Sequence, residues 1–227
     1  MEQQISSFPK QKNEVTELNA RSSVMDLVSG YGFARQGYPV RGLFSIPFVG
    51  LSSNGIPMYN INGKITSTDI DFQTRDNIDY LKYEGPTDPT ITGSFGNIFT
   101  YKAFKLNVFI TYSFGNVVRL NPCFNYQYSD LSSMPREFKN RWTVPGDEKH
   151  TNIPAIISKR QYEDNKDLMY AYNAYNYSTE RIAKGDFIRM KEISLSYDFP
   201  KSWITSAKIS NLSLKTSGYQ FIPNLRR

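Results

Sequence analysis

FKLNVFITYSF, residues 104–114, carries the clearest structural signal in the sequence. Its even positions are apolar or aromatic, and its odd positions are polar apart from Phe109. Side chains that alternate with a period of two are typical of a β-strand with one apolar and one polar face. We expect the apolar face to present Phe104, Leu106, Val108, Ile110, Tyr112 and Phe114.

A second arm is predicted after Gly115–Asn116, a pair that permits the positive φ of a turn. The alternation resumes, and a loop over 115–117 would keep both apolar faces on one side of a hairpin. We therefore predict a hairpin over 104–128, in which Pro122 is awkward for a central strand. The apolar positions expected on its second arm include Leu120, Phe124, Tyr126 and Tyr128.

The length of the first arm favours a membrane strand over a soluble one. Eleven residues at about 3.3 Å each span about 36 Å, or about 27 Å of height at a barrel tilt of about 40°. The apolar band of outer-membrane barrels is about 25 Å tall. Strands of soluble proteins usually have only about 5–6 residues.

Further strands are predicted on both sides of this hairpin. Residues 187–199 form a strand that ends before Pro200, and 211–218 form a shorter one. We expect 24–37 to be a strand and turn, 85–96 to be a loop, and 131–185 to be a long polar connection without regular structure. Short turns that alternate with long loops are typical of outer-membrane barrels. The apolar side of the 187–199 strand is expected to carry Ile193, Leu195, Tyr197 and Phe199.

Composition excludes several classes of function. No stretch approaches the roughly 20 apolar residues of a membrane-spanning helix, while aromatic residues reach 15%. The net charge is +6, but the basic residues are scattered and do not predict nucleic-acid binding. Cys123 and His150 are each the only residue of their type. Because no metal, nucleotide or hydrolase motif is present, we expect no catalytic residue, metal or cofactor, and no enzyme.

Three blocks of sequence carry a resemblance to a known family. They are GYPVRGLFSIPFVGLSSNGIPMY (37–59), GPTDPTITGSFGNIFTYKAFKLNVFITYSFG (85–115), and the region 138–200 with FKNRWTVPGDEKHTNIP and GDFIRMKEISLSYDFP. In order and spacing they resemble the C-terminal barrel region of the SusC/RagA-like, TonB-dependent outer-membrane transporters. A single PGD would carry no weight, but several blocks in order are specific.

The resemblance implies a fold and a function. A complete member would be a plugged barrel of about 22 strands in the cell outer membrane that imports glycans or peptides. Its partners would be a SusD-like surface lipoprotein and the TonB complex. Residues 1–227 would be an all-β, antiparallel, incomplete barrel segment, an open sheet of about five to seven strands with long extracellular loops. The turns at Gly115 and Pro200 would be periplasmic, and 131–185 would face outside.

Such a segment is expected to be a fragment. Fewer than about eight strands cannot close a barrel, and two open edges are unsatisfied in lipid. By itself the segment is therefore expected neither to transport nor to fold stably there. The first residues, MEQQISSFPKQKNEVTELNAR, lack the apolar core of an export signal. The end, YQFIPNLRR, replaces the expected closing strands, so we expect a truncated or frameshifted piece without plug or signal peptide.

The PGD motif is predicted to be structural. Pro145 presets φ, Gly146 tolerates a left-handed backbone, and Asp147 caps its own turn. Arg141 and Trp142 are expected to anchor this loop by stacking or by packing at the barrel rim. Two alternative functions stay open: a small outer-membrane structural barrel or adhesin-like protein, and a secreted carbohydrate-binding β-sandwich.

Overall fold

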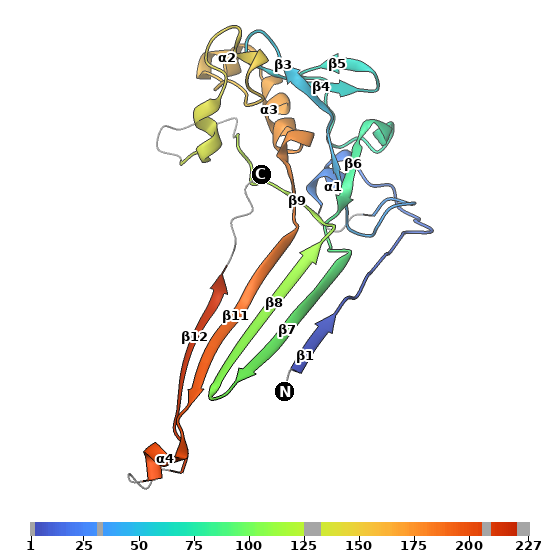
Figure 1. Ribbon diagram of the computed structural model, residues 1–227. Coiled ribbons are helices and arrows are strands. Elements are labelled where there is room, and N and C mark those ends of the chain that lie inside the picture. The colour runs from blue at the N-terminus through green and yellow to red at the C-terminus, as the bar shows by residue number, and fades with distance from the viewer. Residues whose placement is uncertain (1–2, 31–33, 125–132, 206–209, 222–227) are drawn as a thin grey trace. The chain divides into compact units, whose positions relative to one another are not determined.

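The computed structural model describes residues 3–30, 34–124, 133–205 and 210–221 (Figure 1). The chain divides into two compact units. The first, here called the sheet unit, comprises Met1–Lys12, Pro89–Asn116 and Gly185–Arg227. The second, the insert unit, comprises Asn13–Asp88 and Val117–Lys184.

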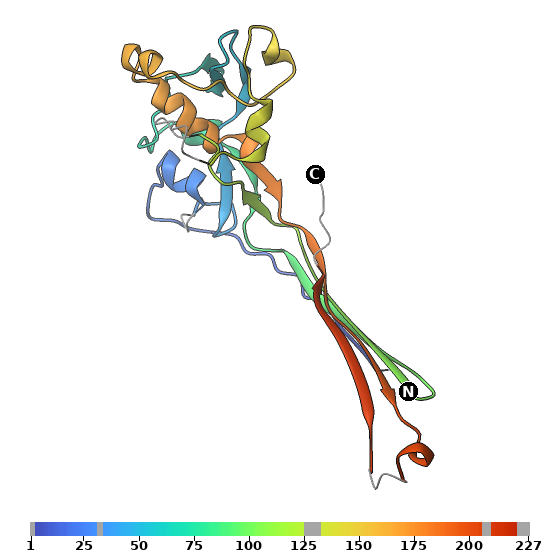
Figure 2. The ribbon, with the colours of Figure 1, turned by 90° about the vertical axis from the view of Figure 1, so that its left-hand side faces the viewer.

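The described strands of the sheet unit form one antiparallel sheet of five strands in the order β1-β7-β8-β11-β12. This is also their order along the chain, so the sheet is a simple meander, and it is a single layer (Figure 2). A short helix, α4 (Lys201–Ile204), lies between the last two strands. The strands are β1 (Gln3–Ser7), β7 (Ile91–Tyr101), β8 (Phe104–Phe114), β11 (Phe187–Asp198) and β12 (Ser213–Phe221).

Short and long connections alternate along this meander. Lys102 and Ala103 alone join β7 to β8, and Lys102 adopts a φ of 53° to make that turn. The register pairs Tyr101 with Phe104 and Phe104 with Tyr197, so the β7–β8 turn and the β11–β12 connection lie at one end of the sheet. The two long connections therefore leave from and return to the other end. The predicted all-β fold with an open antiparallel sheet is confirmed.

The predicted hairpin over 104–128 is wrong. The partners of β8 are β7 and β11. β7 pairs with β8 along all eleven residues and includes half of the stretch predicted as a loop. After β8 the chain does not turn back along it, because residues 117–119 pair with residues 182–184. The Gly115 N–H donates to the Asp186 carboxylate (2.7 Å) and the Gly185 N–H donates to the Asn116 carbonyl (2.8 Å), so this end of β8 lies beside the start of β11. Gly115 thus lies at the opposite end from Pro200, and the two turns cannot both be periplasmic.

The insert unit contains small sheets and helices. Its sheets are β2–β6, β3–β4–β5 and β9–β10.

Residues 24–29 form a helix instead of the predicted strand, because Ser23 and Asp26 cap it reciprocally. Residues 131–185 are also more regular than predicted. The elements are α1 (Val24–Ser29), β2 (Gly42–Ser45), β3 (Phe48–Leu51), β4 (Pro57–Ile61), β5 (Lys64–Thr66), η1 (Ile78–Tyr80), β6 (Lys82–Pro86), β9 (Val117–Arg119), η2 (Arg136–Asn140), η3 (Asp147–Lys149), α2 (Lys159–Asp164), α3 (Leu168–Asn176), η4 (Thr179–Arg181) and β10 (Ile182–Lys184).

Both long connections build the core of the insert unit. The fully buried Tyr59 of the first connection donates its hydroxyl to the Ala171 carbonyl of the second (2.6 Å). Ile46 forms a parallel β-bridge with Ser178. The two connections therefore fold together as one body and do not behave as separate loops.

Arg119 is the central polar link between these connections. Its guanidinium donates to the carbonyls of Phe44 (2.6 Å) and Val28 (3.0 Å) and, more weakly, to that of Ser178 (3.4 Å). Burial lowers the pKa of Arg119 to about 10. A cation is tolerated here because several carbonyl oxygens satisfy its donors.

We predict that Arg119→Met destabilises the insert unit by about 2–4 kcal/mol, because it leaves buried carbonyls without donors. The measurement is urea unfolding of the chain in detergent micelles, followed by the NMR resonance of the Trp142 indole N–H, which separates Trp142 from the second tryptophan, Trp203. Arg41→Met is the control: it removes an exposed ion pair with Asp88 (2.9 Å) and should cost less than about 1 kcal/mol. Equal losses in the two variants would contradict the role of Arg119.

Candidate membrane-facing surface and motif loop

One face of the sheet, here called the apolar face, is apolar across four strands. Residues directly opposite each other in antiparallel strands point to the same side, so the register extends the apolar face of β8 to its neighbours. The register of β11 shifts between Met190 and Glu192, where Lys191 is an extra residue without a partner in β8. This bulge keeps the apolar side chains of β11 beside those of β8 on both sides of the shift. The face adds Ile91, Gly93, Phe95, Asn97, Phe99 and Tyr101 of β7, Ile188, Met190, Ile193, Leu195 and Tyr197 of β11, and Leu214, Thr216 and Gly218 of β12.

The opposite, polar face carries charges and hydroxyls. Lys105 forms an ion pair with Asp198 (2.7 Å), and Lys215 approaches Glu192 (3.7 Å). Phe109, the exception in the alternation of β8, lies over Gly96 of β7, where an added Cβ would come within 2.8 Å of the ring. The ring thus covers a backbone position that has no side chain of its own.

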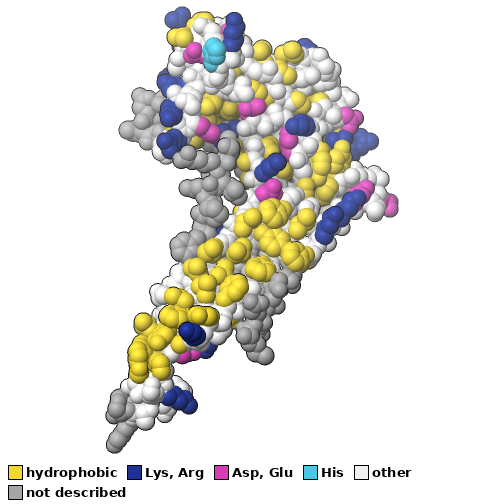
Figure 3. Space-filling view, in the orientation of Figure 1, with side chains coloured by type: hydrophobic (Ala, Val, Ile, Leu, Met, Phe, Trp, Pro, Cys, Tyr) yellow, Lys and Arg dark blue, Asp and Glu magenta, His cyan; other side chains and the backbone are white. Residues whose placement is uncertain are grey.

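Large side chains on the apolar face are open to solvent. Phe104 is 47% exposed, Ile188 48% and Leu195 42%. Figure 3 shows hydrophobic side chains gathered along the strands. In the described part of the sheet unit, no second layer covers this face. A continuous exposed apolar surface of this kind is typical of contact with a membrane or another apolar partner.

Aromatic rings gather at both ends of the apolar face. At the short-turn end, Phe104 contacts Tyr197 (4.7 Å between ring centroids), and Phe199 follows Tyr197 at 5.0 Å. At the other end, Tyr112 contacts Phe8 (5.8 Å) and Phe114 (5.6 Å). From Phe104 to Phe114 the strand rises about 33 Å, or about 25 Å at a tilt of about 40°. Aromatic girdles with this spacing flank the apolar band of outer-membrane barrels.

The fourteen residues predicted to face lipid do not all lie together. The six of β8 share one face with Ile193, Leu195 and Tyr197, and Phe199 follows directly. Leu120 lies in the insert unit outside any strand, where its N–H donates to the Arg181 carbonyl (2.8 Å). Phe124 is only 8% exposed, so both predictions are wrong. Tyr126 and Tyr128 lie outside the described residues. The apolar side of β7 was not predicted from the sequence.

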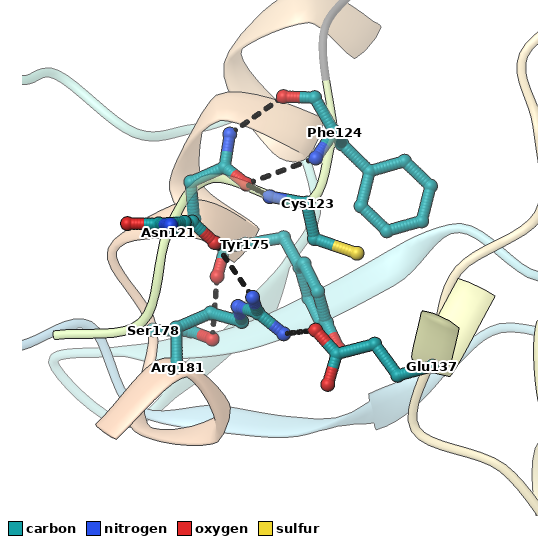
Figure 4. A network of polar contacts seen from close by, with 8 residues as sticks. Asn121, Cys123, Phe124, Glu137, Tyr175, Ser178 and Arg181 are labelled. Carbon is teal, nitrogen blue, oxygen red and sulfur yellow. Dashed lines mark hydrogen bonds and ion pairs between the residues drawn. The ribbon is translucent and has the colours of Figure 1, made fainter. Parts of the chain in front are cut away.

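Phe124 is held in the core by a polar network that Figure 4 shows. The Asn176 amide accepts hydrogen bonds from the N–H groups of Cys123 (2.8 Å) and Phe124 (3.1 Å) and donates to the Phe124 carbonyl (2.7 Å). The buried Arg181 pairs with Glu137 and donates to the Asn121 carbonyl (2.6 Å). The Phe124 ring then packs edge-on against other aromatic rings, those of Phe138, Tyr172 and Tyr175.

The motif loop, residues 141–147, is a closed turn. The Asp147 N–H donates to the Val144 carbonyl (3.1 Å), with Pro145 second and Gly146 third in the turn. Gly146 has a φ of 108°, as the third position of a type II turn requires. The Asp147 carboxylate accepts hydrogen bonds from the N–H of Thr143 (2.9 Å), the N–H of Val144 (3.0 Å) and the Thr143 hydroxyl (2.9 Å). The two backbone bonds are the main cause of its lowered pKa.

Two side chains anchor this loop. The Trp142 indole donates to the Glu148 carboxylate (3.1 Å), and its backbone N–H donates to the Ile153 carbonyl (2.9 Å). Its ring lies against Gly55, where an added Cβ would come within 2.6 Å. The Arg141 guanidinium lies 5.1 Å from the centre of the Phe138 ring. Among the described residues, no cluster of His, Cys, Asp and Glu could hold a metal ion.

No family model matches the chain. It is 24% identical over 204 residues to TonB-dependent receptor P3 of Formosa agariphila, an alignment that covers 86% of this chain and 17% of that receptor. Its fold resembles the RagAB peptide importer in the "open-open" state, with a TM-score of 0.66 and 18% identity over 97% of this chain and 23% of the other. For the RagAB peptide transporter the TM-score is 0.58, with 19% identity over 82% and 19% of the two chains.

The chain therefore spans about a fifth of the length of these relatives. Its likeness to part of a SusC/RagA-like TonB-dependent transporter, which the three sequence blocks predicted, is confirmed. The relatives are named as a receptor, a transporter and an importer, and none is named as an enzyme. Within the described residues, no helix has the length and apolar composition needed to cross a membrane.

We predict that Gly55→Ala destabilises the insert unit by about 2–5 kcal/mol. Gly55 has a φ of 73°, so a side chain adds backbone strain of about 1–2 kcal/mol, and its Cβ would overlap the Trp142 ring at a further cost of about 1–3 kcal/mol. Gly63→Ala is the matched control, because Gly63 has a φ of 86° and nothing within 4 Å of an added Cβ. Urea unfolding of both variants gives the comparison, and equal losses would exclude the Trp142 contact as the cause.

We predict that the Trp142 indole N–H resonance moves on acidification. Hydrogen bonds from its own backbone, the Trp142 indole and the Gly146 backbone lower the pKa of Glu148 from the ordinary 4.5. A lowered pKa means that the contact is fully formed above pH 4.5 and is lost as the pH falls through the folded value. The NMR titration of that resonance should therefore have a midpoint below pH 4.5. Glu148→Gln should abolish the transition, whereas a midpoint above 4.5 would contradict this geometry.

Proposed function

We propose that the sheet unit is a panel of the wall of an outer-membrane β-barrel, within a TonB-dependent nutrient importer. One observation carries the proposal: an uncovered apolar face, aromatic at both ends, lies on strands as long as a membrane is thick. The sequence likeness to a TonB-dependent receptor and the fold likeness to RagAB support the same assignment. The apolar face would contact lipid tails, and the polar face would line the lumen.

The connections give the panel an orientation. Barrels of this kind have short periplasmic turns and long extracellular loops. The Lys102–Ala103 turn and the connection at Pro200 would thus face the periplasm, with Trp203 and the aromatic cluster at that interface. The insert unit, formed by the two long connections, would be extracellular. In this position it is the part of the chain that meets incoming nutrient first.

Transport would belong to the complete barrel. The edge strands β1 and β12 each have one partner in the described sheet, and closure of a barrel would require further strands to pair with them. The family resemblance implies a SusD-like surface lipoprotein and the TonB complex as partners, and a peptide or a glycan as substrate. The structures that this chain resembles are those of a peptide importer, which favours a peptide.

The two alternative functions fit the molecule less well. A carbohydrate-binding β-sandwich needs a second sheet packed on the first, and the described sheet unit supplies none. A small closed barrel needs at least about eight strands, whereas the described sheet has five. An uncovered apolar face is a liability for either protein in water, but it is what a membrane wall requires.

We predict that a fluorescent probe distinguishes the two faces at neighbouring positions of β11. The variant Leu195→Cys places an NBD label on the apolar face, and Ser196→Cys places it on the polar face. In micelles of dodecylmaltoside, the label at position 195 should emit at shorter wavelength and be quenched at least about threefold more by brominated detergent, because only the apolar face contacts detergent tails.

The wild-type chain is the labelling blank, because its single thiol, Cys123, is only 3% exposed. Equal quenching of the two labels would contradict a one-sided membrane surface. Protection of position 195 from both water and detergent would instead support a covered, soluble sheet.

A further inference from the structure

The insert unit contains a cleft of about 520 Å³ that the proposed wall function does not use. Its volume suits a small ligand or a short peptide segment, since such sites usually measure about 300–1,000 Å³. Both long connections contribute to it. The lining residues are Met25, Asp71, Phe72, Gln73, Phe124, Met169, Tyr170 and Asn173.

The walls of the cleft are held by regular structure. The first N–H groups of α1 donate to the segment that contains Asp71 to Gln73. The Val24 N–H donates to the Thr74 carbonyl (3.0 Å), and the Met25 N–H donates to the Phe72 carbonyl (2.9 Å). On the other side, Met169 and Asn173 are one turn apart on α3 and therefore share a face of that helix. The backbone around the cleft is therefore already held in place without a ligand. This lowers the entropy cost of ordering the protein when a ligand binds.

The lining is apolar inside and polar at its rim. Phe72 is 6% exposed and Phe124 is 8% exposed, so their rings form a largely buried floor. Met25 and Met169 flank it with flexible thioether side chains, which adapt to apolar groups of different shapes. An apolar side chain would lose no hydrogen bond to water when it enters the cleft. A sugar hydroxyl on the same floor would have no partner there, so a sugar would depend on the polar side chains at the rim.

Among the described residues that line the cleft, Asp71 alone is charged. Its Oδ1 accepts a hydrogen bond from the Gln73 N–H (2.8 Å), which orients the exposed carboxylate at the rim. The described residues place no basic side chain among the lining residues to neutralise it. A cation is therefore attracted to the cleft and a carboxylate is repelled.

We infer that this cleft binds a peptide segment in which an apolar side chain lies next to an amino or guanidinium group. The apolar side chain occupies the floor of Phe72 and Phe124, and the cation pairs with Asp71. The amide side chains of Gln73 and Asn173 supply donors and acceptors that suit a peptide backbone. This inference names the substrate class of the proposed importer and therefore rests on that proposal.

The test is NMR of the full chain in detergent micelles, with ¹³C-labelled methionine methyl groups. Met25 and Met169 report on the cleft, and Met58 and Met190 lie outside it. The probes are phenylalanyl-lysinamide, its neutral counterpart N-acetyl-phenylalanyl-glutaminamide, and maltotriose. The cationic peptide should shift the two cleft methyl signals and leave the other two unchanged.

A pair of variants isolates the charge. Asp71→Asn keeps the shape of the side chain and should weaken the cationic peptide about two- to fivefold, as expected for an exposed ion pair, with no effect on the neutral peptide. Asp69→Asn is the matched control: it also removes one acidic charge, but Asp69 pairs with Lys64 (3.1 Å) outside the cleft.

Several outcomes would overturn the inference: no shift of the cleft methyl groups in a chain whose other methyl signals are those of a folded protein, tighter binding of maltotriose, or equal affinity of Asp71→Asn for the cationic peptide. The same spectra test the proposed function separately, because Met190 lies on the apolar face. Peptide binding without contact between the Met190 methyl group and detergent tails would retain the cleft and reject the barrel wall.

Discussion

The alternation of side chains across a single-layer sheet is the constraint on which the rest of the sheet unit depends. One face collects most of the large apolar side chains of four strands, and the described sheet unit has no layer to cover them. Removing one such side chain from water is worth about 1.5–3 kcal/mol. A face of this size is therefore stable only where lipid tails or another apolar partner replace water. The extra residue Lys191 keeps the apolar side chains of β11 on that face along the whole strand.

In the proposed barrel wall, the same constraint accounts for where the long connections leave the sheet. A strand pair surrounded by lipid cannot release an irregular segment within the apolar layer, because its backbone groups would lack partners. Both long segments leave the sheet at the same end of its strands, and the unit they form folds by the rules of a soluble protein. Their core is buried, and Arg119 and Tyr59 link the two segments with hydrogen bonds to carbonyl oxygens. One chain thus follows two opposite rules, with apolar groups outward in the sheet unit and inward in the insert unit.

The sequence predicted β8 and β11 correctly because their alternation is nearly uninterrupted. It missed β7 because Gly93 and Gly96 interrupt the pattern, and the reason for Gly96 is the Phe109 ring on the neighbouring strand. Each strand alone shows an irregular position, Phe109 in β8 and Gly96 in β7, but neither strand shows that these two positions pair. The error at Phe124 has a similar origin. Alternation continues past Gly115, but the partners of Phe124 lie on α3 and η2, and only Pro122 signals that the strand has ended.

In the motif loop, too, the local sequence determines one part of the structure, and contacts with distant residues determine the rest. Pro145 and Gly146 specify a type II turn by themselves, so the turn could be predicted. The contact between Trp142 and Gly55 could not, since those residues belong to two different blocks of the family resemblance. This contact makes the two blocks one packing unit. Donors from the loop bind one oxygen of the Asp147 carboxylate and one of the neighbouring Glu148 carboxylate, so these two acidic side chains act to hold the loop in its turn.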